Sequence, residues 1–349
     1  MDKITLLKTV AAFVMAGILS FVLSPAAKRI AYKIGAIDIP KDERRMHKKP
    51  IPRLGGLAVF FAFLVTVVFL VPIDREMQGI LIGALIIVLL GVVDDSIELP
   101  AKFKFLVQIV AATIVVLHGT RIDVISNLNL FSDAPYLNLG LWGIPVTVIW
   151  IVAITNAVNL IDGLDGLSVG VCTIASISLL IIAAIVSEFN VMVITAAVAG
   201  ACIGFLPYNI NPAKMFVGDT GATFLGFILA TLSIQGMFKT YAILSFAVPF
   251  LILGLPIFDT LFAILRRVLN GQSPMHADRG HVHHRLIDLG FSQKQTVLIL
   301  YSVSGILGIS AVLLASSSAQ RALFFVIIMI ALALIGINAY RIIKKNKKR

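Results

Sequence analysis

Long apolar runs recur along almost the whole sequence, and they constrain its fold more than any other feature. A helix needs about 20 apolar residues to cross the roughly 30 Å hydrocarbon core of a bilayer. Hydrophobic residues make up 59% of the chain and charged residues only 13%, which excludes an ordinary soluble domain. We therefore predict an all-α integral membrane protein, one polytopic domain over residues 1–349, with about eleven transmembrane helices. The predicted spans are 4–24, 55–72, 77–93, 103–118, 143–161, 167–186, 191–206, 221–237, 241–265, 295–315 and 321–340.

Three segments carry more specific expectations. Pro249 and Pro256 interrupt the run 241–265, because proline breaks the hydrogen-bond pattern of a helix. The polar stretch 119–142 should hold a short hairpin or a surface helix. Cys172 and Cys202 lie inside apolar runs without metal-ligand spacing, so we expect packing residues and no disulfide.

Basic residues fall mostly in one of the two alternating sets of loops. Segments 25–54, 94–102, 207–220 and 266–294, together with the C-terminal tail, hold most of the 29 lysines and arginines. Short loops rich in these residues stay in the cytoplasm, so we predict an outside N-terminus and a cytoplasmic C-terminus in a bacterial cell membrane. The net charge of +11 then reflects topology and anionic headgroups, and no nucleic-acid partner is expected.

Five aspartates lie at the ends of predicted spans on the cytoplasmic side. They face the loop "MHADRGHVHHRLIDLG", which contains four of the six histidines. Polar groups at the depth of a membrane are costly unless they are paired or functional, so an active site is predicted at the cytoplasmic membrane face. The five residues are Asp94, Asp95, Asp162, Asp165 and Asp219.

Most of these motifs also have a structural interpretation. The pair Asp94 and Asp95 could be a solvated helix end, "GDTG" around Asp219 could be a helix cap, and "HVHH" could be a solvated loop. The stretch "NAVNLIDGLDGL" is more specific. Its Asn156 and Asn159 share a helix face, and its glycines let backbone approach a ligand closely.

Carboxylate and amide oxygens at a membrane edge favour magnesium chemistry on a phosphoryl substrate. Mg²⁺ usually takes one or two protein carboxylates and completes its shell with water and substrate phosphates; Mn²⁺ is the alternative ion. Histidines and basic residues on the facing loop would neutralise a pyrophosphate. At the bilayer edge, one substrate could be soluble and the other a lipid.

Four motifs, in order along the chain, resemble the polyprenyl-phosphate N-acetylhexosamine-1-phosphate transferases of glycosyltransferase family 4. They are "GVVDDSIELPAKFKFLVQ", "NAVNLIDGLDGLSVG", "FVGDTGATFLG" and "ADRGHVHHRLIDLGFSQKQ", and the loop "HKKPIPRLGG" fits as well. The resemblance implies transfer of a sugar 1-phosphate from a UDP-sugar to a polyprenyl phosphate, with release of UMP and with magnesium as cofactor.

The resemblance also implies roles for individual residues. Asp219 and Asn159 would be metal ligands. Asp94, supported by Asp95, would activate the lipid phosphate, and we favour direct attack by that phosphate over an aspartyl intermediate. Asp162 and Lys104 complete the implied catalytic group. The residues implied to bind the donor substrate are Asn156, Asp165, His281, His283, His284 and Arg285.

The form of the histidine loop indicates a branch of the family. The branch that uses UDP-N-acetylmuramoyl-pentapeptide typically has three consecutive histidines, whereas this chain has "HVHHRLIDLG". That form resembles the bacterial undecaprenyl-phosphate N-acetylglucosaminyl 1-phosphate transferases, which use UDP-N-acetylglucosamine and undecaprenyl phosphate. They initiate teichoic acid, lipopolysaccharide or other surface glycans. The pentapeptide transferase remains the alternative.

An ion-coupled transporter is an alternative from a different class. Transporters tend to hold their charges near the midplane in repeated halves, whereas these acids lie at helix ends and no repeat is visible. Asp259 is the exception, about 10 Å inside its span at 1.5 Å per residue; we expect it to pair with Arg266 or Arg267 or to line the lipid-phosphate groove. A catalytically inactive scaffold protein would be expected to have lost residues of these motifs, and no motif is broken here. The oligomeric state, a homodimer included, is left open.

Overall fold

The computed structural model describes residues 3–40, 49–126, 136–235, 247–272, 280–316 and 327–328. Within these ranges the chain is a helical bundle with two antiparallel hairpins, β1 (Ile37–Asp38) with β2 (Ile51–Pro52) and β3 (Val124–Ser126) with β4 (Tyr136–Asn138). A 3-10 turn, Gly140–Trp142, precedes the fifth helix. The α-helices are α1 (Lys3–Ile34), α2 (Gly55–Leu70), α3 (Arg75–Ile97), α4 (Ala101–Leu117), α5 (Gly143–Ile161), α6 (Leu167–Ile185), α7 (Phe189–Asn209), α8 (Gly218–Ser233), α9 (Ala247–Ile252), α10 (Gly254–Leu269), α11 (Val282–Asp288) and α12 (Gln293–Ser316).

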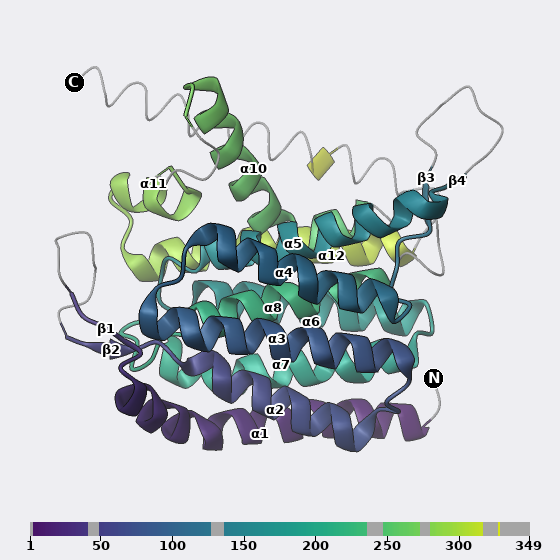
Figure 1. The fold of residues 1–349 in the computed structure, drawn as a ribbon, viewed down its shortest axis with the longest axis horizontal. Helices are drawn as coiled ribbons and strands as arrows, with labels where there is room; N and C mark the ends of the chain where they lie inside the picture. Colours follow the sequence, from purple (N-terminus) through teal and green to yellow (C-terminus); the bar gives the residue numbers. More distant parts are fainter. Residues whose placement is uncertain are drawn as a thin grey trace.

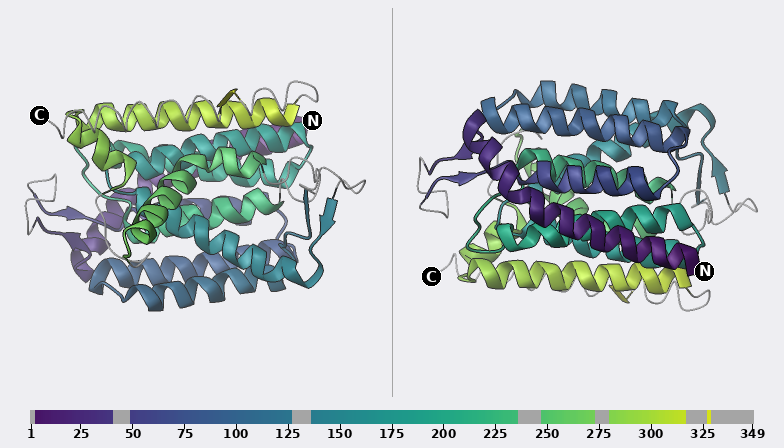
Figure 2. Two further views of the ribbon diagram at one scale, coloured as in Figure 1. Left: turned by 90° about the horizontal axis from the view of Figure 1, so that it is seen from above. Right: turned by 90° about the horizontal axis from the view of Figure 1, so that it is seen from below.

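Most of the helices lie side by side and run between two ends of the bundle (Figure 1). At the end beside β1 and β2, helices α3, α5 and α7 end and helices α4, α6 and α8 begin; we call this the site end. The β3–β4 hairpin lies at the opposite end. Figure 2 shows α12 along one edge of the bundle and the α3–α4 pair along the other.

Helix α8 forms the centre of the bundle and fixes the position of Asp219. All but Asp219 of its 16 residues are buried. Small residues let the neighbouring backbones approach closely, as is usual between membrane helices. A Cβ atom on Gly56 of α2 would lie 2.1 Å from the Gly221 nitrogen, and one on Gly91 of α3 would lie 2.3 Å from the Thr220 Cα. The start of α8 is therefore pressed against the end of α3.

Many hydroxyl groups inside the bundle bond to the backbone of their own helices. Thr66, Thr155 and Ser176 each donate to the carbonyl four residues earlier, at 2.7 Å. Between helices, the Trp150 indole N–H donates to Ser233 Oγ at 3.1 Å. Such bonds matter because a bilayer core offers no water to an unpaired polar group.

Six helical segments in the described part of the chain are long and apolar enough to cross a membrane. The 16-residue α2 is a shorter apolar helix, about 24 Å long at 1.5 Å per residue. The chain is thus an all-α, multi-pass membrane protein, as predicted. The count of eleven spans and the orientation stay predictions, and span 321–340 lies outside the described residues except at 327–328. The six segments are Lys3–Ile34, Arg75–Ile97, Gly140–Ile161, Leu167–Ile185, Phe189–Asn209 and Gln293–Ser316.

The structure corrects two predicted spans and agrees with a third expectation. The run 241–265 is not one helix: α9 ends at Ile252 and α10 leaves the bundle at a steep angle (Figure 1). Pro256, in the first turn of α10, has no N–H to donate to the preceding turn. Helix α1 extends ten residues beyond the predicted 4–24, because Ala27 and Ala31 still pack against the bundle. The β3–β4 hairpin and the turn after it lie in 119–142, where a hairpin or surface helix was expected.

Candidate active site

Asp95 joins the end of α3 to the start of α8 through hydrogen bonds. Its Oδ1 accepts a hydrogen bond from the Asp219 N–H at 3.0 Å, and its Oδ2 accepts from the N–H and the hydroxyl of Thr220 at 3.0 and 2.6 Å. These amides belong to the first turn of α8, which has no partners for them within the helix. A carboxylate there is also favoured by the helix dipole. Asp95, which is buried, is therefore placed to hold Asp219 in position.

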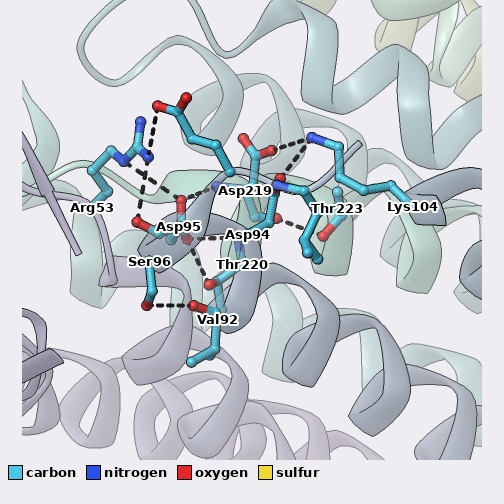
Figure 3. Close-up of polar contacts among 11 residues, drawn as sticks. Arg53, Val92, Asp94, Asp95, Ser96, Lys104, Asp219, Thr220 and Thr223 are labelled. Carbon is cyan, nitrogen blue, oxygen red and sulfur yellow. Dashed lines mark hydrogen bonds and ion pairs between the residues drawn. The ribbon is translucent and has the colours of Figure 1, made fainter. Parts of the chain in front are cut away.

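Asp94 and Asp219 converge on one ammonium group, although they come from different helices (Figure 3). Lys104 Nζ lies 2.6 Å from Asp94 Oδ2 and 3.1 Å from Asp219 Oδ2. The other Asp94 oxygen accepts the Leu99 N–H at 2.7 Å. The Asp94 side chain is 5% exposed and the Asp219 side chain 37%, so Asp219 is the carboxylate more open to a ligand.

A pocket of about 320 Å³ opens over these side chains. Arg53, Asp94, Glu98, Leu99, Lys104 and Asp219 line it. Arg53, just before α2, donates to the Asp95 carbonyl at 3.3 Å, and its Nη2 lies 4.0 Å from Glu98 Oε1. Two cationic side chains thus stand beside carboxylates in one pocket, an arrangement that suits a phosphate ligand together with a cation.

The oxygen ligands of this pocket fit Mg²⁺ better than they fit a metal ion that needs a complete set of protein ligands. Among the residues that the structure describes, no three histidine, cysteine, aspartate or glutamate side chains form a metal-ligand group. Mg²⁺ needs only one or two carboxylates, because waters and substrate phosphates complete its shell. Asp94 and Asp219 already share one cationic partner, Lys104. This convergence of two carboxylates on a positive charge is the observation that supports a divalent cation here.

The two asparagines of "NAVNLIDGLDGL" lie on α5 and differ in their contacts. Asn156 Nδ2 donates to Gln108 Oε1 of α4 at 2.6 Å and to the Val152 carbonyl at 2.8 Å. The Asn159 side chain is half-buried and makes no hydrogen bond to any described residue. Asn156 is thus engaged in joining α5 to α4, whereas the Asn159 amide is available for a ligand.

Asp162 follows the last residue of α5 and is held by the next helix. Its Oδ1 accepts from Ser168 Oγ of α6 at 2.5 Å. Burial raises the pKa of Asp162 to about 7; the Asp219 and Asp165 carboxylates act in the same direction, and the Ser168 hydrogen bond opposes them. A carboxyl group with this pKa changes protonation state near neutral pH, which is the range useful for proton transfer.

Asp165 holds the connection between α7 and α8. Its Oδ2 accepts from Asn211 Nδ2 at 2.9 Å and from the Ala213 N–H at 3.0 Å. From α12, Tyr301 donates its hydroxyl to the Gly166 carbonyl at 2.5 Å. Gly166 has a φ of 79°, a left-handed conformation that glycine adopts without strain. These contacts fix the shape of the turn that carries Asp162 and Asp165.

The histidines of "HVHH" lie at the start of α11, against that same turn. The rings of His281 and His283 are stacked, with centroids 5.7 Å apart, and His283 Nε2 faces Gly163 so closely that a Cβ atom there would lie 2.2 Å from it. His283 is 3% exposed, and its Nε2 has no hydrogen-bond partner in the described part of the chain. Burial lowers the pKa of His283 to about 4; His284 and His281 add to this, and Asp259 opposes it.

The structure thus gathers most of the predicted site at the site end. Asp94, Asp95, Lys104 and Asp219 contact one another; Asp162 and Asp165 lie on the adjacent turn, with His283 packed against it. Arg285 is exposed, and His284 packs on His283 with centroids 4.2 Å apart. His276 lies outside the described residues. Of the two alternatives for Asp259, pairing with Arg266 or Arg267 is not what the structure shows, because the carboxylate bonds to His281 and Val282; a place in the lipid-phosphate groove stays a prediction.

Sequence reasoning missed several residues that the structure places here. Arg53, Gln108, Ser168, Thr220 and Tyr301 are common residue types without a motif of their own. All but Tyr301 lie inside stretches quoted above: Arg53 in "HKKPIPRLGG", Gln108 in "GVVDDSIELPAKFKFLVQ", Ser168 in "NAVNLIDGLDGLSVG" and Thr220 in "FVGDTGATFLG".

Comparison with known proteins gives a consistent set of relatives. The family model described as glycosyl transferase family 4 matches residues 77–237. A Bacillus subtilis (strain 168) protein named "Probable undecaprenyl-phosphate N-acetylglucosaminyl 1-phosphate transferase" is 40% identical over 93% of this chain and 90% of its own length. A "Decaprenyl-phosphate N-acetylglucosaminephosphotransferase" of Mycobacterium tuberculosis (strain ATCC 25618 / H37Rv) is 32% identical over 85% and 80%. A "Phospho-N-acetylmuramoyl-pentapeptide-transferase" of Clostridium beijerinckii is 30% identical over 86% and 94%.

Proposed function

Because the chain belongs to glycosyl transferase family 4, we propose that it transfers N-acetylglucosamine 1-phosphate from UDP-N-acetylglucosamine to undecaprenyl phosphate. The products are undecaprenyl-diphospho-N-acetylglucosamine and UMP. This would be the first lipid-linked step of teichoic acid or another surface glycan, at the cytoplasmic face of a bacterial cell membrane. The observation that carries the proposal is the pocket in which Asp94, Asp219 and Lys104 meet at the site end of a membrane bundle.

The proposed reaction is a displacement at phosphorus. An oxygen of the lipid phosphate forms a bond to the phosphorus that carries the sugar, and the diphosphate bond to UMP breaks. Lys104 would hold a phosphate oxygen, because an ammonium group is a strong donor to phosphate. Asp94 would orient the lipid phosphate or accept its proton, and Asp162, with a pKa near 7, would exchange a proton nearby. Asp95 would keep Asp219 and Thr220 in place.

Magnesium is proposed as the cofactor, with Mn²⁺ as the alternative. Asp219 would hold the ion, since its side chain is more exposed than that of Asp94, and Asn159 would supply the amide oxygen. When bound, the ion would offset the negative charge on the phosphorus oxygens.

The choice of N-acetylglucosamine over the muramoyl-pentapeptide rests on two observations. The B. subtilis relative is 40% identical to this chain, against 30% for the pentapeptide transferase quoted above. The loop reads "HVHH", not three consecutive histidines. We keep the pentapeptide donor as the alternative that the assay must test.

The test is a transfer assay with purified protein, undecaprenyl phosphate, magnesium and a panel of radiolabelled UDP-sugars. We expect label from UDP-N-acetylglucosamine in the lipid phase, and little from UDP-N-acetylmuramoyl-pentapeptide. Asp219→Asn should lose transfer at ordinary magnesium, whereas Asp288→Asn, an exposed aspartate of α11, should retain it. The opposite donor preference would refute the branch. Absence of transfer from every donor would refute the enzyme and favour the transporter alternative.

A further inference from the structure

Asp259 of α10 is a buried carboxylate whose two oxygens both bond to the histidine segment. The residue is 4% exposed. Its Oδ2 lies 2.7 Å from His281 Nδ1, and its Oδ1 accepts the Val282 N–H at 2.7 Å. The reaction proposed above gives Asp259 no task, although a buried charge is expensive unless it is paired and hydrogen-bonded.

The contact with Nδ1 determines how the His281 ring can act. A carboxylate beside Nδ1 favours a proton on that nitrogen, as in the carboxylate–histidine pairs that orient metal-bound and catalytic imidazoles. The neutral ring then presents its Nε2 lone pair, and the protonated ring presents an Nε2 N–H. In both states Nε2 is the atom left for a ligand, and the ring cannot turn without breaking the 2.7 Å contact.

Helix α10 holds three successive residues of this segment. In addition to the two bonds from Asp259, Arg266 Nη1 donates to the Gly280 carbonyl at 2.9 Å. A Cβ atom on Gly280 would lie 1.8 Å from Arg266 Nη2, so a larger residue there would push the Arg266 guanidinium aside. Helix α10 thus fixes the position of residues 280–282. The His283 ring, which stacks on the His281 ring, determines how closely this segment approaches the turn at Gly163.

We propose that Asp259 is a positioning residue for the donor site: it holds the His281 ring through Nδ1, so that Nε2 faces the donor's pyrophosphate and, in the doubly protonated ring, its N–H donates to a pyrophosphate oxygen. Asp259 does not touch the substrate in this scheme. The inference rests on the proposed function, because it assigns the His281 ring a phosphate contact.

The first arm of the experiment compares Asp259→Asn with Asp288→Asn. Asparagine keeps the volume but removes the negative charge and turns one oxygen into an NH₂ donor, so it neither accepts from Nδ1–H nor balances the charge of the doubly protonated His281 ring. We expect a 10- to 100-fold loss in kcat/KM for UDP-N-acetylglucosamine, about the size found when a supporting partner of a functional histidine is removed. The KM for undecaprenyl phosphate should stay within about twofold of wild type. Asp288→Asn should match wild type in both. Equal rises in the two KM values would overturn the proposal, since they would indicate a general structural effect.

The second arm is a double-mutant cycle with His281→Gln. If Asp259 acts through His281, then Asp259→Asn adds almost nothing once His281 has been replaced, because residues that act as a unit are non-additive. The same fold-loss in both backgrounds would overturn the proposal.

A third arm does not depend on the reaction. Hydrogen exchange of the full chain in detergent should show faster exchange over residues 280–288 in Asp259→Ala than in wild type, with little change in α3. Unchanged exchange would overturn the positioning role by itself. Failure of wild-type transfer, by contrast, would refute the proposed function and leave the exchange arm to decide whether Asp259 holds the histidine segment.

Discussion

At the scale of single residues, the unusual feature is that Lys104 serves two carboxylates at once. Its Nζ contacts Asp94 at 2.6 Å and Asp219 at 3.1 Å. Two carboxylates that share a site repel each other when both are ionised, so the lysine supplies the positive charge that allows them to face one pocket. A cation or phosphate entering the pocket must meet all three groups.

We expect Lys104→Met to unfold at a lower temperature than wild type in the absence of magnesium, and to gain more stability when magnesium is added. A divalent cation that binds the folded state stabilises it by mass action, and it would replace the missing charge. Transfer should fall at least about tenfold, because a hydrogen bond to a charged group contributes about 1.5–3 kcal/mol. Thermal unfolding with and without magnesium checks this. Lys102→Met, an exposed lysine of the same helix, is the control, and identical responses of the two variants would contradict the prediction.

His283 predicts a pH dependence of stability with a defined sign. Its pKa is about 4 in the folded protein and about 6.5 in an unfolded chain. Between these values the unfolded state binds the proton more readily, so stability is full above about pH 6.5 and is lost as pH falls toward 4. His283→Gln removes this group, and its unfolding midpoint should therefore fall less than that of wild type between pH 7 and 4.5. An equal fall of the unfolding midpoint in the two proteins over this pH range would show that His283 does not titrate in this way.

At the scale of elements, the site depends on how closely three helices approach. Gly56 of α2 and Gly91 of α3 face the first turn of α8 at distances that exclude a side chain. Asp95 then bonds to the same turn. The position of Asp219 relative to Asp94 is therefore set by glycine packing and by a carboxylate cap together.

Gly91→Ala should separate α3 from α8 and displace Asp219. We expect a loss of about 1–3 kcal/mol in unfolding free energy, the usual range for overpacking, and a larger relative loss of transfer than of stability. Gly305→Ala of α12 is the matched control, because no atom of another described segment lies within 4 Å of its Cβ position and alanine is the better helix former. Thermal unfolding and the transfer assay measure both variants. A stable, fully active Gly91→Ala protein would show that this contact does not position Asp219.

At the scale of the whole molecule, the orientation of the site end in the membrane can be tested directly. The basic loops predict the cytoplasm. Cys172 and Cys202 are buried at 1% and 0% exposure, so both should be silent toward thiol reagents in the folded protein. This allows new cysteines to report on topology against the natural background.

We expect a membrane-impermeant maleimide to label Ser187→Cys in intact cells and Lys214→Cys only after lysis. Ser187 is exposed between α6 and α7, at the end opposite the site, and Lys214 is exposed between α7 and α8, at the site end. Wild-type protein controls for the natural cysteines. The reverse labelling pattern would place the site outside and contradict the proposed use of a cytoplasmic UDP-sugar.

The sequence by itself determined the class of fold and the neighbourhood of the site. Apolar runs long enough to cross a bilayer predict helices wherever they occur, and Asp94, Asp162 and Asp219 follow or precede such runs on one side. Their common location at the site end followed from that alternation. Run length does not show where a helix continues on polar residues, as α1 does to Ile34, or where it breaks, as it does after Ile252.

Only the tertiary structure decided which side chains meet. Asp95 and Thr220, Gln108 and Asn156, and Asp259 and His281 are each far apart in sequence and are joined by hydrogen bonds between different helices. The apolar pattern could not reveal these pairs, because it does not show which faces of different helices meet; α8, for example, is buried on all sides. The Asp95–Thr220 pair follows from close backbone approach at Gly56 and Gly91, which depends on how helices pack against one another and not on the hydrophobicity of any one of them.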